Sequence, residues 1–348
     1  MTATADGSWS TTPTTGHARP PRSRPCCRTR LYMAGYTPAR RPTLYFIGVT
    51  TAGSSIMRVF PAWAEHLGLG DATIAGIDFP LHAEPMRYRE AVRFIKTDPL
   101  SRGALITTHK IDLFEACRDL FGRIDPHARL MGEASCISKS GSDLVAHAKD
   151  PISAGLTLDG FLPADHFART GADLFVIGAG GSATAITWHL MRKSRGQNAP
   201  RRILISDRSP ERLAAIRGFH RHVETDAALE YIDATPAGAN DGVLAGLAPG
   251  SLVINATGLG KDAPGSPLTD AARFPERGIA WELNYRGDLV FLEQARAQQA
   301  ERHLQVENGW TYFIHGWTQV IAEVFGITIP TAGPRFEAIA RIAATGRP

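Results

Sequence analysis

The stretch DLFVIGAGGSATAITWHL at residues 173–190 decides the fold, because an apolar run enters a glycine-rich turn and continues as a helical pattern. Gly178 and Gly180 directly follow the predicted strand, and Ala183 completes a G-x-G-x-x-A pattern. Glycines there permit a tight turn and let backbone N–H groups approach a pyrophosphate at the positive end of a helix. The motif alone also fits an ordinary strand-to-helix turn, but the flanking strand, helix and following acid favour dinucleotide binding.

The next predicted strand, RRILISDRS at 201–209, ends in groups that bear on the choice of cofactor. Asp207 at its tip can accept hydrogen bonds from both ribose hydroxyls and repels a 2′-phosphate, which favours NAD. Arg208 and Arg212 can pair with that phosphate or stack on adenine, which leaves NADP open. The interval from Gly178 exceeds the usual ~20 residues, and the insertion-like SRGQNAPR at 194–201 accounts for the excess.

Strand-like and helix-like patterns alternate on both sides of this loop, which predicts βαβ units and parallel sheets. The expected strands lie at 43–49, 72–79, 104–108, 172–178, 202–207, 251–257 and 279–285, and the expected helices at 56–67, 86–97, 111–121, 182–193 and 209–218. Residues 135–148 read as a hairpin and 150–167 as a connector between domains. Residues 308–326 predict one long amphipathic helix that ends at Gly326.

We therefore predict an α/β protein of two domains, with an N-terminal α/β substrate domain and a Rossmann-type NAD(P)-binding domain. The expected boundaries are a disordered tail over 1–42, a substrate-binding and catalytic domain over 43–155, the Rossmann domain over 156–305 and C-terminal helices over 306–348. A chain of 348 residues with 43% hydrophobic residues is long enough for two cores.

The net charge of +4 is concentrated in the tail, where residues 1–42 hold seven arginines and one acid. The remainder carries −2 (4 − 6), so we expect no nucleic-acid partner. An arginine-rich, acid-poor start is also typical of a transit peptide, although translation from Met33 explains it as well. We expect no membrane span, no metal site and a cytoplasmic location, because no long apolar run or metal-ligand spacing occurs.

Several motifs, in order and spacing, resemble those of the shikimate/quinate dehydrogenase family over most of residues 43–330. They are GAGGSA at 178–183, NATGLG at 255–260, ELNYRGDLVFLEQA at 282–295, His109-Lys110 after an apolar strand, and the tryptophan-rich helix near the end. The resemblance implies that this closing helix packs on the first domain. It also implies cofactor contacts from Gly178, Gly180, Gly181, Ser182, Ala183, Asp207, Arg208, Ser209, Arg212, Thr257, Gly258, Leu259, Leu283 and Gly309.

The same resemblance implies that Lys110 and Asp150 share a proton across the reacting ring hydroxyl. Removing a hydride from a secondary alcohol requires its O–H proton to leave as well, and a lysine with a lowered pKa could accept it. We expect partial desolvation between the domains to lower the pKa of Lys110. Taken singly, Lys110 could be a surface lysine at a helix start and Asp150 a turn residue before Pro151.

The predicted substrate pocket departs from the family pattern. Candidate substrate-binding residues are Ser54, Ser55, Thr107, Ser135, Tyr285, His315 and Gln319, while Ile56, Ala104, Ile106 and Gly316 stand where the family has polar groups. Losing several polar contacts, at about 1–3 kcal/mol each, would abolish useful shikimate affinity unless other groups, such as Arg58 or His315, replace them. The sequence therefore predicts a dehydrogenase-like paralogue acting on a related polyhydroxylated ring, such as a cyclitol.

Other functions remain open at this point. They are an authentic shikimate 5-dehydrogenase of aromatic amino acid biosynthesis, a non-catalytic NAD(P)-binding sensor, and a methylenetetrahydrofolate dehydrogenase of similar layout, which would not explain the motif at 282–295. We expect a monomer or a homodimer with a small-molecule polyol as substrate.

Overall fold

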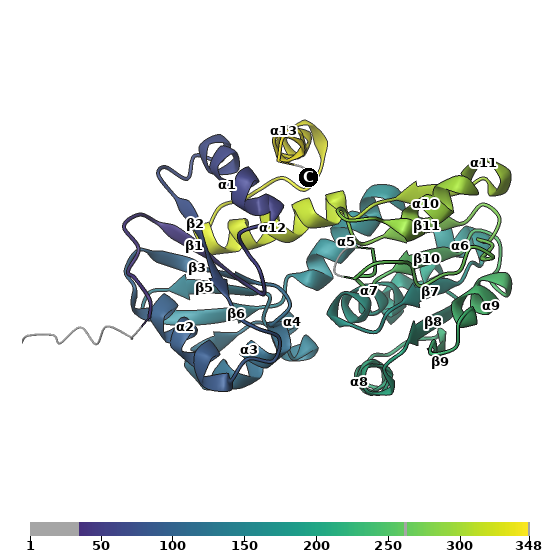
Figure 1. The fold of residues 1–348 in the computed structure, drawn as a ribbon, viewed down its shortest axis with the longest axis horizontal. Helices are drawn as coiled ribbons and strands as arrows, with labels where there is room; N and C mark the ends of the chain where they lie inside the picture. The colour runs from purple at the N-terminus through teal and green to yellow at the C-terminus, as the bar shows by residue number, and fades with distance from the viewer. Residues whose placement is uncertain (1–34, 261–262, 347–348) are drawn as a thin grey trace, which may run out of the picture. The chain divides into compact units, whose positions relative to one another are not determined.

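The computed structural model describes residues 35–260 and 263–346, and the predictions for residues 1–34, including the start at Met33, lie outside them. Two six-stranded sheets form the core of the protein (Figure 1). Strands β1–β6 belong to the first sheet and strands β7–β12 to the second, so each half of the chain builds its own sheet, and the two-domain α/β prediction is confirmed.

The first sheet has the order β2-β1-β3-β5-β6-β4, with β1, β2 and β3 parallel and β5 antiparallel to both β3 and β6. Its strands are β1 (Thr43–Gly48), β2 (Thr73–Asp78), β3 (Ser101–Ile106), β4 (Arg123–Ile124), β5 (Cys136–Ser140) and β6 (Asp143–His147). Alternate residues of β1 point to opposite faces, as the period of two in a strand requires. Tyr45 and Ile47 join one core, while Leu44 and Phe46 join the other.

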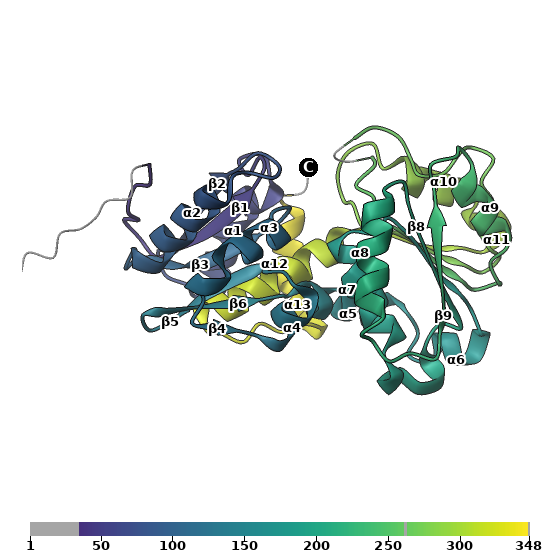
Figure 2. The ribbon, with the colours of Figure 1, turned by 90° about the horizontal axis from the view of Figure 1, so that it is seen from below.

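Helices cover both faces of this sheet (Figures 1 and 2). One face carries α2 (Pro85–Thr97), α3 (Lys110–Cys117) and α4 (Pro126–Met131), and the other carries α1 (Ser55–His66) together with α12 (Trp310–Phe325) and α13 (Gly333–Ala344) from the end of the chain. The ring centroids of Phe46 in β1 and Trp317 in α12 lie 5.0 Å apart. The long helix ends where predicted, because Gly326 adopts the left-handed conformation (φ 64°) that closes helices.

The second sheet is parallel throughout and has the order β12-β11-β10-β7-β8-β9. Its strands are β7 (Leu174–Ile177), β8 (Arg202–Asp207), β9 (Ala228–Asp233), β10 (Leu252–Asn255), β11 (Ile279–Glu282) and β12 (Gln305–Glu307), and its helices include α6 (His166–Thr170), α7 (Gly181–Met191), α8 (Pro210–His220), α9 (Ala239–Ala245), α10 (Val290–Ala297) and α11 (Gln299–Arg302). The direction of winding reverses between β7 and β10, where doubly wound folds bind their ligands. The predicted Rossmann-type domain is confirmed.

The predicted connector at 150–167 is mostly helical, a feature that the sequence analysis did not identify, because Asp150–Phe161 form helix α5. Within this helix, Gly155 serves the close packing of two helices. A Cβ at Gly155 would lie 2.6 Å from Cε1 of His189 in α7. The predicted domain boundary between residues 155 and 156 thus falls inside a continuous helix, whose first residue is Asp150.

The predicted disordered tail extends too far, because residues 36–42 pack against the first sheet's helices and loops. Tyr36 stacks on Phe94 with ring centroids 4.9 Å apart, and the amide of Ala39 donates to Oδ2 of Asp98 at 2.9 Å. Composition missed these contacts because a single aromatic ring, Tyr36, anchors the segment on α2.

Candidate active site

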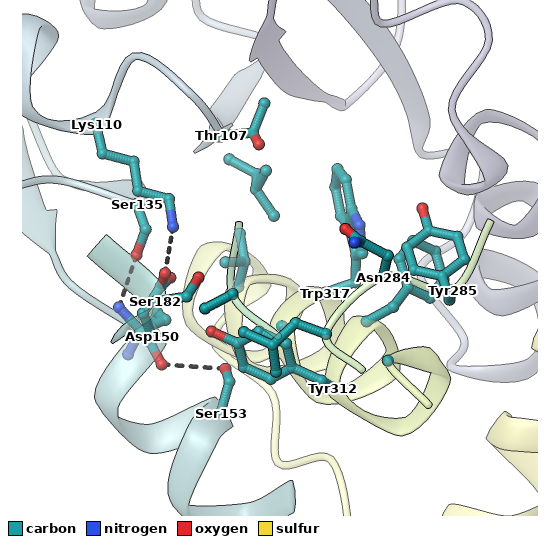
Figure 3. Close-up of a pocket in the computed structure, with 18 of the residues that line it drawn as sticks. Thr107, Lys110, Ser135, Asp150, Ser153, Ser182, Asn284, Tyr285, Tyr312 and Trp317 are labelled. Atoms are coloured by element: carbon teal, nitrogen blue, oxygen red, sulfur yellow. Dashed lines mark hydrogen bonds and ion pairs between the residues drawn. The ribbon is translucent and has the colours of Figure 1, made fainter. Parts of the chain in front are cut away.

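A cavity of about 370 Å³, here called the inner cavity, is lined by residues from both sheets' connecting segments and from α12 (Figure 3). Its polar lining consists of Thr107, Lys110, Ser135, Lys149, Asp150, Ser153, Ser182, Thr257, Asn284, Tyr285 and Tyr312. Its apolar lining includes Leu105, Ile106, Phe313, Trp317 and Val320. Figure 3 shows Ser135, Asp150 and Ser182 close to Lys110, whereas Asn284 and Tyr285 lie away from it beside Trp317.

Lys110 and Asp150 meet in this cavity although 40 residues separate them in the sequence. Strand β3 ends at Ile106, the amide of Lys110 donates to the carbonyl of Thr107 at 3.1 Å, and α3 begins at Lys110. Asp150 begins α5, so its carboxylate lies at the positive end of a helix. Lys110 Nζ donates a hydrogen bond to Asp150 Oδ2, with the side chains 20% and 14% exposed.

The expected lowering of the pKa of Lys110 is wrong. Burial does oppose the charged ammonium, but the carboxylates of Asp150 and Glu133, together with the Tyr312 hydroxyl, outweigh burial and raise the pKa of Lys110. The sequence prediction considered desolvation alone and could not see two acids converging on one ammonium. The resting pair is therefore an ion pair with the proton on Lys110.

Tyr312 and Glu133 are site residues that the sequence reasoning missed. The Tyr312 hydroxyl lies beside Ser182 and near Asp150, and burial raises its pKa. Figure 3 shows Ser182 and Tyr312 next to the Lys110–Asp150 pair. Tyr312 could have been found from helical spacing, because the residues of α12 that line the cavity form one stripe: Tyr312, Phe313, Gly316, Trp317 and Val320.

Ser135 and Lys149 adjoin the pair and hold each other in place. Ser135 Oγ accepts a hydrogen bond from the backbone amide of Lys149 at 2.7 Å. The Lys149 ammonium donates to Oε2 of Glu323 at 2.6 Å, which neutralises its charge. The predicted site residue Ser135 thus lines the cavity, together with Thr107, and Lys149 is an addition that the sequence did not suggest.

Four of the predicted substrate-binding residues do not line the inner cavity. Ser54 and Ser55 form the start of α1 and lie near the hydroxyl of Tyr285. Burial raises the pKa of Tyr285, and these two hydroxyls oppose the rise only in part. Because the Tyr285 ring lines the cavity and the serines do not, they contribute to the cavity through Tyr285.

His315 and Gln319 occupy other faces of α12. The His315 ring is 2% exposed and stacks on Phe336 of the α13 segment at 4.5 Å, next to a different cavity. Gln319 is half-buried and is absent from the lining of the inner cavity. Each lies one residue before a residue that lines the inner cavity, Gly316 or Val320, and the sequence prediction could not tell which stripe of α12 faces inward.

A second cavity of about 510 Å³, here called the outer cavity, adjoins the carboxyl ends of β7, β8 and β10. Its lining includes Gly180, Ser206, Asp207, Arg208, Arg212 and Leu259, and it shares Ala256, Thr257 and Gly258 with the inner cavity. An extended ligand could therefore pass from one cavity to the other along residues 256–258, as a dinucleotide does across a switch point.

The glycine loop has the backbone geometry that a dinucleotide requires. Gly178 has φ 108°, and a Cβ there would lie 2.8 Å from the carbonyl oxygen of Ala256. A Cβ at Gly180 would meet no atom within 4 Å, so the N-terminus of α7 is open for a phosphate to approach. Gly181 begins α7, Ser182 lines the inner cavity, and Ala183 is fully buried under the loop. The residues present thus fit the pyrophosphate of a nicotinamide cofactor.

Asp207 also has a structural role, which the sequence did not reveal. Its Oδ2 accepts from the amide of Ala179 at 2.8 Å and its Oδ1 accepts from the amide of Ser209 at 2.8 Å, which ties the glycine loop to the start of α8. Ser209 caps α8 by accepting from the amide of Arg212 at 3.2 Å. Leu283 and Gly309, also predicted to contact cofactor, line the inner cavity, and a Cβ at Gly309 would lie 1.9 Å from the Leu283 carbonyl oxygen.

Within residues 35–260 and 263–346, no helix combines the length and apolarity needed to cross a bilayer. In that part of the chain, His, Cys, Asp and Glu side chains form no group of three or more that could hold a metal ion.

No family model matches this sequence. Two curated relatives are shikimate dehydrogenases (NADP⁺), each 26% identical to this chain. The enzyme from Streptococcus thermophilus matches over 180 residues, which is 51% of this chain and 58% of the relative, so the match spans little more than half of that protein. The enzyme from Symbiobacterium thermophilum matches over 235 residues, which is 66% of this chain and 72% of the relative.

Solved structures share the fold over nearly their whole length. Shikimate 5-dehydrogenase from Thermus thermophilus in complex with NADP(H) and shikimate has a TM-score of 0.63 and 22% identity, over 87% of this chain and 99% of that one. Quinate dehydrogenase from Corynebacterium glutamicum in complex with NAD has a TM-score of 0.65 and 17% identity, over 88% and 99%. 5-Ketofructose reductase from a Gluconobacter strain has a TM-score of 0.62 and 18% identity, over 88% and 99%.

Proposed function

We propose that this chain, which is shikimate dehydrogenase-like in sequence and fold, is an NAD(P)-dependent oxidoreductase that interconverts a ring hydroxyl and its ketone. The observation that supports this most is the Lys110–Asp150 ion pair in a cavity that shares residues 256–258 with the outer cavity beside the glycine loop. A lysine and a carboxylate that could exchange a proton with a substrate thus lie next to a site that fits a dinucleotide. A decayed, purely cofactor-binding protein has no need to keep that pair together.

The cofactor would be held by the glycine loop and by the residues around Asp207, Arg208 and Arg212. When bound, the nicotinamide supplies or accepts the hydride. The chain's own residues handle the proton. In ketone reduction, the Lys110 ammonium donates its proton to the substrate oxygen, so that one N–H bond breaks and one O–H bond forms. In alcohol oxidation, neutral Lys110 accepts that proton, and Asp150 stabilises the ammonium that results.

The substrate that we propose is a polyhydroxylated six-membered ring or cyclitol distinct from shikimate. Thr107, Ser135, Asn284, Tyr285 and Tyr312 can hydrogen-bond hydroxyls. The apolar wall of the cavity offers little to compensate a carboxylate, and Lys149 is already paired with Glu323. A charged group left without partners in such a site costs at least about 1–3 kcal/mol, which disfavours shikimate and quinate.

A panel of ring polyols and ring ketones, assayed with NAD(H) and NADP(H) and including shikimate and quinate, tests this proposal. We expect turnover of at least one uncharged ring polyol, or reduction of its ketone, with the two acids as poor substrates. Efficient turnover of shikimate and quinate with micromolar Michaelis constants would instead show that the protein is an authentic shikimate or quinate dehydrogenase. Cofactor binding with no turnover across the panel would favour the sensor alternative.

A further inference from the structure

Glu133 is a buried acid that the reaction described above does not use. Glu133 is only 4% exposed. It lies between the end of α4 and the start of β5, directly after Gly132, which closes α4 with φ 66°. The backbone on its C-terminal side is fixed by two hydrogen bonds. The amide of Ala134 donates to the carbonyl of Lys110 at 3.1 Å, and that of Ser135 donates to the carbonyl of His147 at 2.9 Å. Glu133 is therefore anchored directly to the segment that carries Lys110.

The Glu133 carboxylate faces the first turn of the cofactor helix. Its Oε2 lies 3.0 Å from the position that a Cβ on Gly181 would occupy, and Gly181 begins α7. A carboxylate buried in this way is costly to ionise unless nearby charges compensate it or it binds a proton.

The charged and titratable groups that act on Glu133 come from three other elements. Lys110 of α3 favours the ionised carboxylate, while Asp150 of α5 disfavours it. Tyr312 of α12 belongs to the same cluster and is influenced by Glu133 in turn. Burial raises the pKa of Glu133 to about 7, with Lys110 lowering it and Asp150 raising it further. The Glu133 carboxylate in turn contributes to the raised pKa of Lys110.

We propose that Glu133 is a positioning residue for the proton, whose ionised carboxylate keeps the proton on Lys110 in the resting enzyme. The inference rests on the proposed function, since it assigns Glu133 to the control of that same reaction. Lys110 cannot accept a proton from the substrate until it has released its own to solvent, and a second nearby anion opposes this release. Glu133 thus biases the site toward carbonyl reduction, for which Lys110 must arrive protonated.

The substitution Glu133→Gln tests the charge with little change of shape. With one anion removed, Lys110 should lose its proton more readily, so the rise in the rate of alcohol oxidation with increasing pH should move to lower pH by about one unit, which corresponds to roughly 1.4 kcal/mol of electrostatic coupling. Glu133→Asp keeps the charge and should restore a rise at a pH close to that of the wild type. A uniform loss of rate in Glu133→Gln, with the profile unmoved, would show a merely structural role. An equal shift in Glu133→Asp would exclude the charge as the cause.

A measurement without turnover separates this inference from the proposed function. The Lys110 side-chain signal of isotopically labelled full-length protein, assigned with Lys110→Arg, can be titrated by NMR in the wild type and in Glu133→Gln. We expect the Lys110 midpoint to fall in the variant even if no substrate in the panel reacts. An unchanged midpoint would overturn the inference whether or not the enzyme is active, and a shifted midpoint without any turnover would refute only the proposed reaction.

Thermal unfolding provides the folding control. In the unfolded chain Glu133 loses its proton above about pH 4.5, whereas its raised pKa lets the folded protein keep that proton up to about pH 7. The contribution of Glu133 to the free energy of unfolding therefore falls as the pH rises from about 4.5 through about 7. Glu133→Gln should therefore have a melting temperature at least as high as the wild type at pH 8, with a smaller advantage at pH 5. A melting temperature far below the wild type at pH 8 would overturn the account of Glu133 as a buried acid whose pKa is raised in the folded protein.

Discussion

The outer and inner cavities are built by different means although they share residues 256–258. The outer cavity and its glycine loop depend largely on backbone: the φ of Gly178, the open space above Gly180 and the end of a parallel strand. The inner cavity depends on side chains from separate elements, with Lys110 on α3, Asp150 on α5 and Tyr312 on α12. A backbone site can be read from a local motif, whereas a side-chain site exists only after distant elements have packed.

The largest effect is expected when only the proposed proton-transfer group, Lys110, is removed. Lys110→Ala should lower kcat by about 10²- to 10⁴-fold, because general acid–base catalysis of this kind supplies that much. Binding of the nicotinamide cofactor, measured by fluorescence titration, should stay within twofold because the glycine loop is untouched. If the Kd for the cofactor rose in parallel with the loss of kcat, cofactor binding would depend on Lys110, which would contradict the assignment of the two tasks to different cavities.

Lys96→Ala is the matched control for that variant. Lys96 also pairs with an aspartate, since its Nζ lies 3.8 Å from Oδ1 of Asp143, but it belongs to α2 and lies outside both cavities. Its removal should leave kcat and cofactor binding unchanged, because an exposed pair contributes little. A comparable loss of activity would show that the assay responds to general damage.

A smaller but still large effect is expected on stability where the inner cavity meets the start of α12. Gly309→Ala would place a Cβ 1.9 Å from the Leu283 carbonyl oxygen, so the backbone must shift at a cost of about 1–3 kcal/mol. Urea unfolding should show a lower midpoint with an unchanged slope. Gly316→Ala, inside the helix that Gly309 precedes, is the control, because its Cβ would meet no atom within 4 Å. It should leave stability equal or raise it by up to about 1 kcal/mol. Equal stabilities of the two variants would contradict the packing described.

The smallest expected effect concerns the side-chain component of the outer cavity. Replacing Arg208 and Arg212 by alanine should weaken NADPH relative to NADH by about tenfold, equivalent to roughly 1.4 kcal/mol, because only NADPH carries the 2′-phosphate. The ratio of kcat/KM for the two cofactors, or of their Kd values, measures this. Arg296→Ala on α10, which removes an exposed pair with Glu293, is the control. An unchanged ratio would assign cofactor choice to Asp207 instead.

The fold was largely predictable because the periodicity of apolar residues, and the glycines that end strands and helices, are local features of the sequence. Apolar runs at 174–177 and 252–255, the glycines that follow β7, and Gly326 at the end of α12 predicted the corresponding strands, loop and helix end. The failures are equally specific. Helix α5 was not identified within the predicted connector, and the close approach of His189 to Gly155, which requires the absence of a Cβ there, is visible only in the folded protein.

The candidate site was predictable only in part. Lys110, Asp150, Thr107, Ser135 and Tyr285 were named from the sequence, and the structure brings all of them to one cavity. His315 and Gln319 were misplaced because a helix presents its stripe according to packing, which spacing alone cannot orient.

The sequence by itself thus determined two α/β halves and a dinucleotide-type loop, and its resemblance to a known family implied the pairing of a lysine with an aspartate. Only the tertiary structure decided that Glu133 and Tyr312 complete this cluster and that the pKa of Lys110 is raised instead of lowered. The physical reason is that chain connectivity sets the local periodicity of apolar and polar residues, whereas electrostatic coupling depends on distances between residues that only folding brings together.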